Sequence, residues 1–363
     1  MNQITRILTV GPSPQEDPAV AEGARLLREG SLVAFPTETV YGLGADACNA
    51  EAVAKVFAAK QRPSDNPLIV HLAHGGMTAD YADPVPPETA ALAKAFWPGP
   101  LTLIMPAAEK VRRTLARDLG TVALRVPGHP VAQALLSLTG FGVAAPSANL
   151  SGRPSPTTAA HVAHDLEGRI PLILDGGPCP VGIESTVLDL SGDVPTILRP
   201  GQITCDQIAS VLGREVPTVG GDLHRSPGTR YRHYMPETPL FLVEPNTAQN
   251  HFERFFDEHP GKVGYLGIRP LSATFKHRVD QRYCSPDQMA AQLYAALRAF
   301  DGNGAAWILV DMPPEHPVYR GLPTGSTAPL VASSDPVTGS AKTGDNRFSA
   351  VPMSRYDERA ETS

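Results

Sequence analysis

The sequence predicts an α/β fold, in which a twisted, mixed sheet covered by helices is followed by a smaller α/β unit. Short apolar runs that stop at prolines are typical of buried strands, and the amphipathic runs between them are typical of helices. The two kinds of segment interleave without strict alternation, which favours a mixed sheet over a doubly wound parallel one. A length of 363 residues favours two domains.

The first predicted domain, residues 1–216, holds most of these segments. Amphipathic periodicity predicts helices over residues 19–28, 51–60, 88–96, 130–138, 158–166 and 205–212. Apolar runs predict strands over residues 32–35, 68–72, 101–105, 122–126, 143–145, 171–174, 185–190 and 196–199. The last two strands are expected to pair as a hairpin. Gly30 suits the end of the first helix because glycine readily adopts the left-handed C-cap conformation.

The remainder of the chain divides into a linker, a small unit and a tail. Residues 217–239 lack apolar periodicity and are rich in Gly, Pro and basic residues, so we expect a linker. Residues 240–322 are predicted to form the small α/β unit, with strands at 240–243, 262–267 and 306–311 and helices at 250–257 and 287–300. Residues 323–363, rich in Ser, Thr, Gly and Pro, are expected to be largely disordered.

Composition and charge exclude several classes of protein. A net charge of −6 argues against non-specific nucleic-acid binding as the main role. We expect a cytoplasmic protein, because neither a membrane-spanning apolar run nor a signal-peptide layout is apparent. The four cysteines are far apart and form no CxxC pair, so neither a structural zinc site nor a disulfide framework is expected. Two histidine pairs at i, i+3 spacing lack a third ligand, and no metal site is predicted.

A candidate anion site lies where the helix over residues 51–60 meets the next strand. Lys60 and Arg62 stand at the helix end, Ser64 and Asn66 follow in a polar corner, and His71 lies inside the apolar run over 68–72. Cations beside neutral donors favour an oxyanion site, although cations at a helix end are also favoured by the helix dipole alone. A lone strand histidine is more often a core residue than a catalytic one.

Arg125 is the second candidate, because it lies within an apolar strand. A guanidinium in such a place is costly unless it is paired. It could form a structural ion pair with an acidic residue, or it could bind a carboxylate or phosphate through its two-pronged hydrogen-bonding face. The residues alone leave these two interpretations equal.

Small polar side chains follow two other predicted strands. Residues 146–152 (PSANLSG) and 183–187 (IESTV) gather hydroxyl and amide groups, as either ordinary turn residues or a wall of donors around a polar ligand. They contain no GxSxG motif, so a hydrolase nucleophile is not expected. Residues 37–44 (TETVYGLG) would let backbone approach a ligand, but neither a Rossmann nor a P-loop motif is present.

Taken together, these segments resemble the YrdC-like family, in its two-domain form that makes threonylcarbamoyladenylate. The resemblance covers about residues 15–215, and SPGTRYRHYMP (226–236) resembles the family's interdomain linker. The segments that carry it are PTETVYGLGADA (36–47), AKQRPSDNPLIVHL (59–72), FWPGPLTLI (96–104), VALRVPGHP (122–130), APSANLSGRPSPT (145–157), IESTVLDL (183–190) and ILRPGQI (197–203). One departure is that the family's second domain ends in a helix, whereas residues 323–363 show no helical pattern.

The resemblance implies a fold, a reaction and a set of site residues. The fold is a twisted open sheet with a large, concave, positively charged cavity, followed by a smaller Rossmann-like domain. The reaction joins L-threonine, bicarbonate or CO₂, and ATP into threonylcarbamoyl-AMP and pyrophosphate. The implied threonine-binding residues are Thr39, His71, Arg125, Ala145 and Ser185. The implied ATP-binding residues are Arg62, Asn66, Thr121, Ser147, Asn149, Ser155, Arg199 and Tyr234, with Lys60 and Arg62 as the catalytic pair.

By the same resemblance, Lys60 and Arg62, with Mg²⁺ bound to ATP, stabilise charge on the phosphoryl oxygens. The linker over residues 217–239 would serve as a lid, in which Tyr234 covers the nucleotide. The product would pass to the machinery that transfers the threonylcarbamoyl group to tRNA, next to the anticodon. Two alternatives remain: an RNA- or ribosome-binding protein without catalysis, and carbamoyl transfer to a protein partner. The acidic net charge disfavours the first, and absent zinc-finger cysteines disfavour the second.

Overall fold

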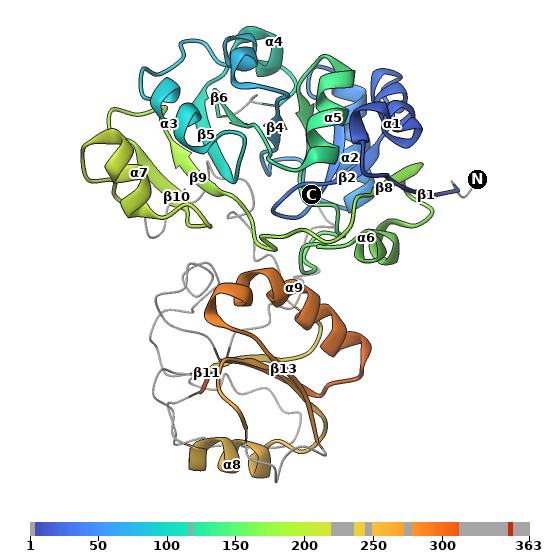
Figure 1. Ribbon diagram of the computed structural model, residues 1–363, viewed down its shortest axis with the longest axis vertical. Coiled ribbons are helices and arrows are strands. Elements are labelled where there is room, and N and C mark those ends of the chain that lie inside the picture. The colour runs from blue at the N-terminus through green and yellow to red at the C-terminus, as the bar shows by residue number, and fades with distance from the viewer. Residues whose placement is uncertain are drawn as a thin grey trace, which may run out of the picture. The chain divides into compact units, whose positions relative to one another are not determined.

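The computed structural model of the protein describes residues 4–115, 119–218, 236–243, 249–271, 278–311 and 348–350. The chain divides into two compact units, Met1–Tyr234 and Met235–Ser363. Each unit is described by itself (Figure 1). The helices and strands predicted from periodicity are all present, and their ends lie within two residues of the predicted ones.

A ten-stranded sheet forms the centre of the first unit (Figure 1). In spatial order its strands are β1 (Arg6–Thr9), β8 (Leu172–Asp175), β2 (Val33–Pro36), β3 (Tyr41–Asp46), β7 (Val143–Ala144), β4 (Ile69–His71), β6 (Thr121–Arg125), β5 (Leu101–Pro106), β9 (Thr186–Asp189) and β10 (Thr196–Arg199). The pairs β1–β8, β8–β2, β4–β6 and β5–β9 are parallel and the others antiparallel, which confirms the predicted mixed sheet. The hairpin of β9 and β10 is likewise confirmed.

Helices connect these strands and cover the sheet. They are η1 (Pro14–Glu16), α1 (Pro18–Arg28), α2 (Ala50–Lys60), η2 (Gly75–Asp80), α3 (Thr89–Phe96), α4 (Glu109–Arg112), α5 (Pro130–Thr139), α6 (Ala159–Leu166) and α7 (Cys205–Leu212). Around β8, β2 and β3 both faces are covered, because side chains alternate along a strand. Val33 and Phe35 pack under α1 and α5, whereas Ala34 packs under α2 and α6.

Among the described residues, helices cover the other half of the sheet, from β4 to β10, on one face only. One face packs against α3, α4 and α7 in the largest core cluster of the unit. The opposite face carries a small cluster of Ile69, Ile104, Ala123, Val187 and Leu198, to which none of the described helices contributes. This half-covered region therefore leaves room for a ligand against the sheet.

Helix α2 is fixed at both ends, and it delivers the predicted cations to the sheet edge. The Asn49 side chain caps its first turn by accepting from two backbone N–H groups. Gln61 ends it in the left-handed conformation, at φ 52°, and the Arg62 N–H then bonds back to the Phe57 carbonyl. The chain is thereby turned sharply at Lys60–Arg62.

The second unit is a smaller, mostly parallel sheet with two described helices (Figure 1). Its strand order is β13 (Val279–Tyr283), β12 (Val263–Gly267), β14 (Trp307–Asp311), β11 (Leu240–Val243) and β15 (Phe348–Ala350). The helices are α8 (Gln249–Glu258) and α9 (Pro286–Gly302). Only β15 pairs antiparallel, on β11. This small α/β unit agrees with the predicted second domain fold.

Four strands were missed by the sequence patterns. Strand β15 (Phe348–Ala350) lies within residues 323–363, which were expected to be largely disordered. Strand β3 overlaps the glycine-containing residues 37–44, for which the sequence patterns predicted no strand, and its glycines fit a tightly packed strand. A Cβ on Gly44 would lie 2.7 Å from Val143 and 2.8 Å from Phe35. Strands β1 and β13 are sheet edges with partial apolar content.

Candidate functional site

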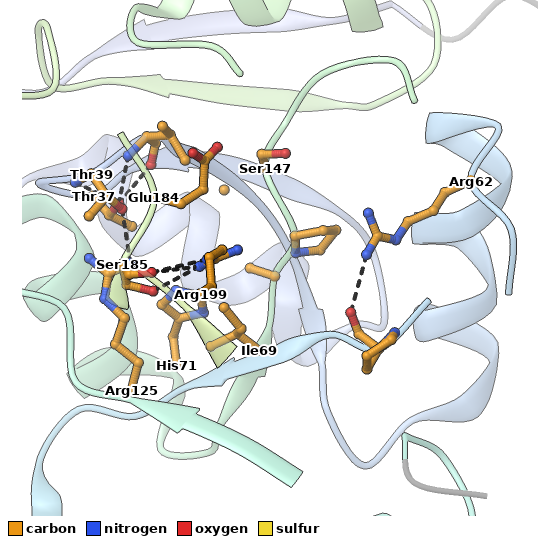
Figure 2. A pocket seen from close by; sticks show the side chains of 15 residues that line it. Thr37, Thr39, Arg62, Ile69, His71, Arg125, Ser147, Glu184, Ser185 and Arg199 are labelled. Carbon is orange, nitrogen blue, oxygen red and sulfur yellow. Dashed lines mark hydrogen bonds between the residues drawn. The ribbon is translucent and has the colours of Figure 1, made fainter. Parts of the chain in front are cut away.

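A pocket opens on the half-covered region of the first unit, with about 520 Å³ of empty space that includes its open mouth. Figure 2 shows the side chains around it. The residues that line it are Thr37, Thr39, Val40, Gly42, Arg62, Pro67, Ile69, His71, Arg125, Ala145, Pro146, Ser147, Glu184, Ser185 and Arg199.

Arg125 is held in this pocket by neighbours on three sides. Its Nε donates to the Gly99 carbonyl at 3.2 Å, and Nη1 donates to the Thr39 hydroxyl at 2.9 Å. Nη2 lies 2.7 Å from Oε1 of Glu38, an ion pair whose orientation does not make a hydrogen bond. The sequence left a structural ion pair and a ligand clamp equal, and the structure shows the ion pair on a side chain that also lines the pocket. The Nη2 group retains hydrogen-bonding capacity for a ligand carboxylate.

His71 stands beside Arg125 because the two residues are direct partners in the parallel register of β4 and β6. Both side chains therefore leave the sheet on the same face, and the imidazole also meets the edge of the Phe35 ring. Burial, and to a smaller extent the Arg125 charge, lowers the pKa of His71 to about 3. The imidazole is neutral at physiological pH, and its Nδ1 has no hydrogen-bond partner among the residues that the structure describes.

Ser185 and Arg199 close this end of the pocket from the hairpin. Arg199 donates to the Ser185 carbonyl through Nε and Nη2, and Nη2 also lies 3.1 Å from the Ser185 hydroxyl. That hydroxyl is 2.7 Å from the Thr102 hydroxyl on β5. The antiparallel pairing of β9 and β10 brings the two residues together, so the hairpin places one cation and one hydroxyl at a fixed position.

Arg62 lies at the other end of the pocket. In Figure 2 it stands apart from the group formed by Arg125, His71 and Ser185, and its Nη2 donates to the Pro67 carbonyl at 3.2 Å. Ser147 lies between the two ends in this view. The pocket thus has two cationic ends, and among its lining side chains only Glu184 carries a carboxylate. Such a site suits a ligand with separated anionic groups.

Eight of the predicted site residues meet in this one pocket. They are Thr39, Arg62, His71, Arg125, Ala145, Ser147, Ser185 and Arg199. Five others do not line it. Asn66 and Ser155 are fully buried, Thr121 lines a smaller adjacent cavity that shares Pro67, and Lys60 and Asn149 lie behind the wall. Tyr234 lies outside the described residues.

The sequence patterns missed two acidic residues. Glu184 lines the pocket and accepts a hydrogen bond from the Ser155 hydroxyl at 2.6 Å. Glu38 lies behind Arg125 and also accepts from the Gly128 N–H at 2.9 Å. A buried arginine requires a counter-charge, and this requirement was the only sequence signal for Glu38. It did not single out Glu38, because several acidic residues could have supplied the charge.

Comparisons with known proteins identify the family of this chain. Residues 25–201 match the Sua5/YciO/YrdC family, described as "Telomere recombination", and residues 203–322 match the family described as "Threonylcarbamoyl-AMP synthase, C-terminal domain". A threonylcarbamoyl-AMP synthase from Bacillus subtilis is 45% identical over 308 residues, covering 82% of this chain and 89% of the relative. The chain belongs to the Sua5/YciO/YrdC family.

Other members of the Sua5/YciO/YrdC family extend the likeness to structure. A threonylcarbamoyl-AMP synthase from Pyrococcus abyssi is 43% identical over 298 residues, covering 79% of this chain and 87% of the relative. The crystal structure of P. abyssi Sua5 in complex with L-threonine is similar at a TM-score of 0.76 and 39% identity, covering 85% of this chain and 92% of that one. The predicted fold and family are therefore confirmed.

None of the helices that the structure describes is long and apolar enough to cross a membrane. Within the described part of the chain, no group of three or more His, Cys, Asp or Glu side chains is placed to hold a metal ion.

Proposed function

We propose that this chain synthesises L-threonylcarbamoyl-AMP and pyrophosphate from L-threonine, ATP and bicarbonate or CO₂. The observation that carries the proposal is the two-ended pocket, with Arg125 at one end and Arg62 at the other. A relative's structure in complex with L-threonine supports the amino-acid end. The names of the close relatives support the reaction.

At the amino-acid end, Arg125 would bind the threonine carboxylate. Its guanidinium is already oriented by Gly99 and Thr39, so little ordering remains when the carboxylate arrives. The neutral imidazole of His71 would offer its unpartnered Nδ1 to a polar atom of threonine. Thr39, Ser185 and the backbone at Ala145 would complete the wall.

At the other end, Arg62 and Ser147 would bind the triphosphate, with Arg199 between the two substrates. The nucleotide would extend across Pro67, which both cavities share, toward Thr121. Asn66 lies in the turn between Arg62 and Pro67, and Ser155 holds Glu184, so both would shape the ATP site from behind the lining. We retain Tyr234 as a residue that covers the nucleotide.

The reaction requires two successive attacks. The threonine amine, after loss of a proton to solvent, attacks the carbon of CO₂ to give a carbamate and releases a second proton. A carbamate oxygen then attacks the α-phosphorus of ATP, and the bond from that phosphorus to pyrophosphate breaks. Arg62 and Arg199 would stabilise the charge that grows on the phosphoryl oxygens, while the pocket supplies most of the rate by positioning.

Mg²⁺ would enter with ATP. It is commonly held in proteins by one or two carboxylates together with substrate phosphates. Glu184 is the single carboxylate among the lining residues and fits this requirement. When bound, Mg²⁺ would neutralise part of the triphosphate charge.

Product transfer and location are further parts of the proposal. Threonylcarbamoyl-AMP is a reactive mixed anhydride, which a second enzyme would consume to modify tRNA next to the anticodon. We place the chain in the cytoplasm, where ATP and tRNA are available.

The test is an assay of pyrophosphate release. Folded protein incubated with ATP, bicarbonate and Mg²⁺ should release pyrophosphate when L-threonine is added, and much less without it. Arg125→Ala should raise the threonine concentration needed for half-maximal rate at least about tenfold, because each hydrogen bond between charged groups contributes about 1.5–3 kcal/mol. Its ATP affinity should change by less than about twofold. Folded wild type without threonine-dependent release would overturn the proposal.

A matched control separates binding from folding. Arg125→Ala alone leaves the Glu38 carboxylate buried without its ion partner, which is destabilising. The double variant Arg125→Ala/Glu38→Gln removes that charge, so it should recover stability without recovering threonine affinity. Equal loss of threonine and ATP affinity in the double variant would mean that Arg125 is structural.

A further inference from the structure

Lys60 was expected to contact the triphosphate, but its side chain lies elsewhere. Only 1% of the residue is exposed, and it does not line the pocket. Its ammonium donates to the backbone carbonyls of Ser147 and Asn149, which lie 87 and 89 residues further along the chain. Both carbonyl oxygens therefore point toward one cation, and without it their dipoles would oppose each other.

Asn149 fixes the same segment from its other side. Its Oδ1 accepts from the Ser147 hydroxyl at 2.6 Å, and its Nδ2 donates to the carbonyls of Leu150 and Arg153 at 2.7 and 2.9 Å. The Ser151 N–H in turn donates to the Lys60 carbonyl at 3.0 Å. The end of α2 and the 147–153 segment are thus joined by hydrogen bonds in both directions.

We propose that Lys60 and Asn149 are positioning residues, which hold the 147–153 segment in the pocket wall and act on ATP through Ser147. The proposal rests on the proposed function only in taking ATP as the ligand. Ser147 is the member of this network that reaches the pocket, between its two ends (Figure 2). Removal of the Lys60 ammonium would leave two carbonyls without their donor and release the segment.

Four of the residues expected at the ATP site thus divide into two pairs. Arg62 and Ser147 line the pocket, whereas Lys60 and Asn149 lie behind it. The segment is also anchored from α6, because the Asp165 carboxylate accepts from the Leu150 N–H at 3.3 Å. Because misplacement of a ligand-binding group by about 1 Å can be costly, even a partial release of this segment would weaken the contact of Ser147 with ATP.

The first test measures hydrogen exchange of the ligand-free full chain. In Lys60→Met, which keeps the aliphatic stem and removes the ammonium, backbone amides of residues 147–153 should exchange about tenfold faster or more. Asn149→Ala should accelerate exchange of the same amides. Because this variant leaves the buried Lys60 in place, it provides the test if Lys60→Met does not fold. Arg62→Met, which removes a cation that lines the pocket, should not accelerate exchange of these amides. Unchanged exchange in both Lys60→Met and Asn149→Ala would overturn the proposal.

The second test is a double-mutant cycle on ATP affinity. Lys60→Met should weaken ATP binding about tenfold in the wild type, but by less than about threefold when Ser147→Ala is already present, because both act through one contact. Arg62→Met should weaken ATP binding as much in the Ser147→Ala background as in the wild type. Additive losses for Lys60→Met and Ser147→Ala would show direct contact with ATP and overturn the proposal. A chain that binds no ATP at all would refute the proposed function, while the exchange test would still report on the network.

Discussion

At the scale of single residues, the site combines two kinds of side chain. Cationic side chains suit the anionic groups of a ligand, and polar side chains beside them remain uncharged. Burial, and then the positive charge of Arg125, its partner in register, keep His71 neutral. A neutral imidazole can bind a polar atom of threonine without repelling its ammonium group. The same lowered pKa makes the stability of the protein depend on pH.

This dependence can be predicted with its sign. The pKa of His71 is about 3 in the folded protein, against an ordinary value of 6.5. Between these two pH values, the unfolded chain binds a proton on His71 more readily than the folded protein does. The contribution of His71 to stability is fully present above pH 6.5 and is lost as the pH falls from there toward 3. Between pH 7.5 and pH 5, the wild type should lose about 2 kcal/mol more stability than His71→Gln.

The measurement is urea unfolding of the first unit at each pH. The chain has two tryptophans, Trp97 in the first unit and Trp307 in the second, so a Trp307→Phe background leaves Trp97 fluorescence as the reporter. His129 also has a pKa lowered by burial, but it is present in both proteins and cancels in the comparison. Parallel pH profiles for the wild type and His71→Gln would contradict the prediction.

At the scale of helices and strands, most of the architecture could be predicted, because buried strands and amphipathic helices leave distinct periods in the sequence. Arg125, Ser147 and Ser185 were found for a related reason, since polar residues beside apolar runs stand out. The burial of Lys60 could not be predicted, because its partners come from a segment 87 residues away. Strand β3 was missed because two glycines in six residues suggest a loop.

Close backbone packing at the start of the β9–β10 hairpin gives a prediction at this scale. A Cβ on Gly201 would lie 2.5 Å from the Thr186 nitrogen and 2.7 Å from the Glu184 carbonyl oxygen. Backbone atoms cannot move aside cheaply, so Gly201→Ala should separate Ser185 from Arg199 and destabilise the first unit by about 1–3 kcal/mol. Threonine-dependent pyrophosphate release should fall with it.

Gly192 offers the matched control for that substitution. It lies in the turn of the same hairpin, and a Cβ there would meet nothing within 4 Å. Gly192→Ala should therefore retain the activity and the unfolding midpoint of the wild type. Similar behaviour of the two variants would mean that the close approach at Gly201 does not position the Ser185–Arg199 pair.

At the scale of the whole molecule, every residue that lines the pocket belongs to the first unit. The second unit carries its own sheet and its own core, which includes Phe256, Tyr265 and Leu309. Threonine binding should therefore depend on the first unit, whereas the linker over residues 217–239 should matter for steps that involve ATP. The linker residue Tyr234 lies outside the described residues, so its role has to be tested in solution.

The last prediction separates these contributions with two proteins. A chain that ends before Ser226 keeps every pocket-lining residue, so its threonine affinity should stay within about threefold of the full chain, while turnover falls at least about tenfold. Tyr234→Ala in the full chain should reproduce the loss of turnover if the ring covers the nucleotide, because it removes that contact and leaves the second unit in place. Unchanged turnover in the shortened chain would refute a lid role for Tyr234. Loss in the shortened chain but not in Tyr234→Ala would assign the effect to other residues from 226 onward.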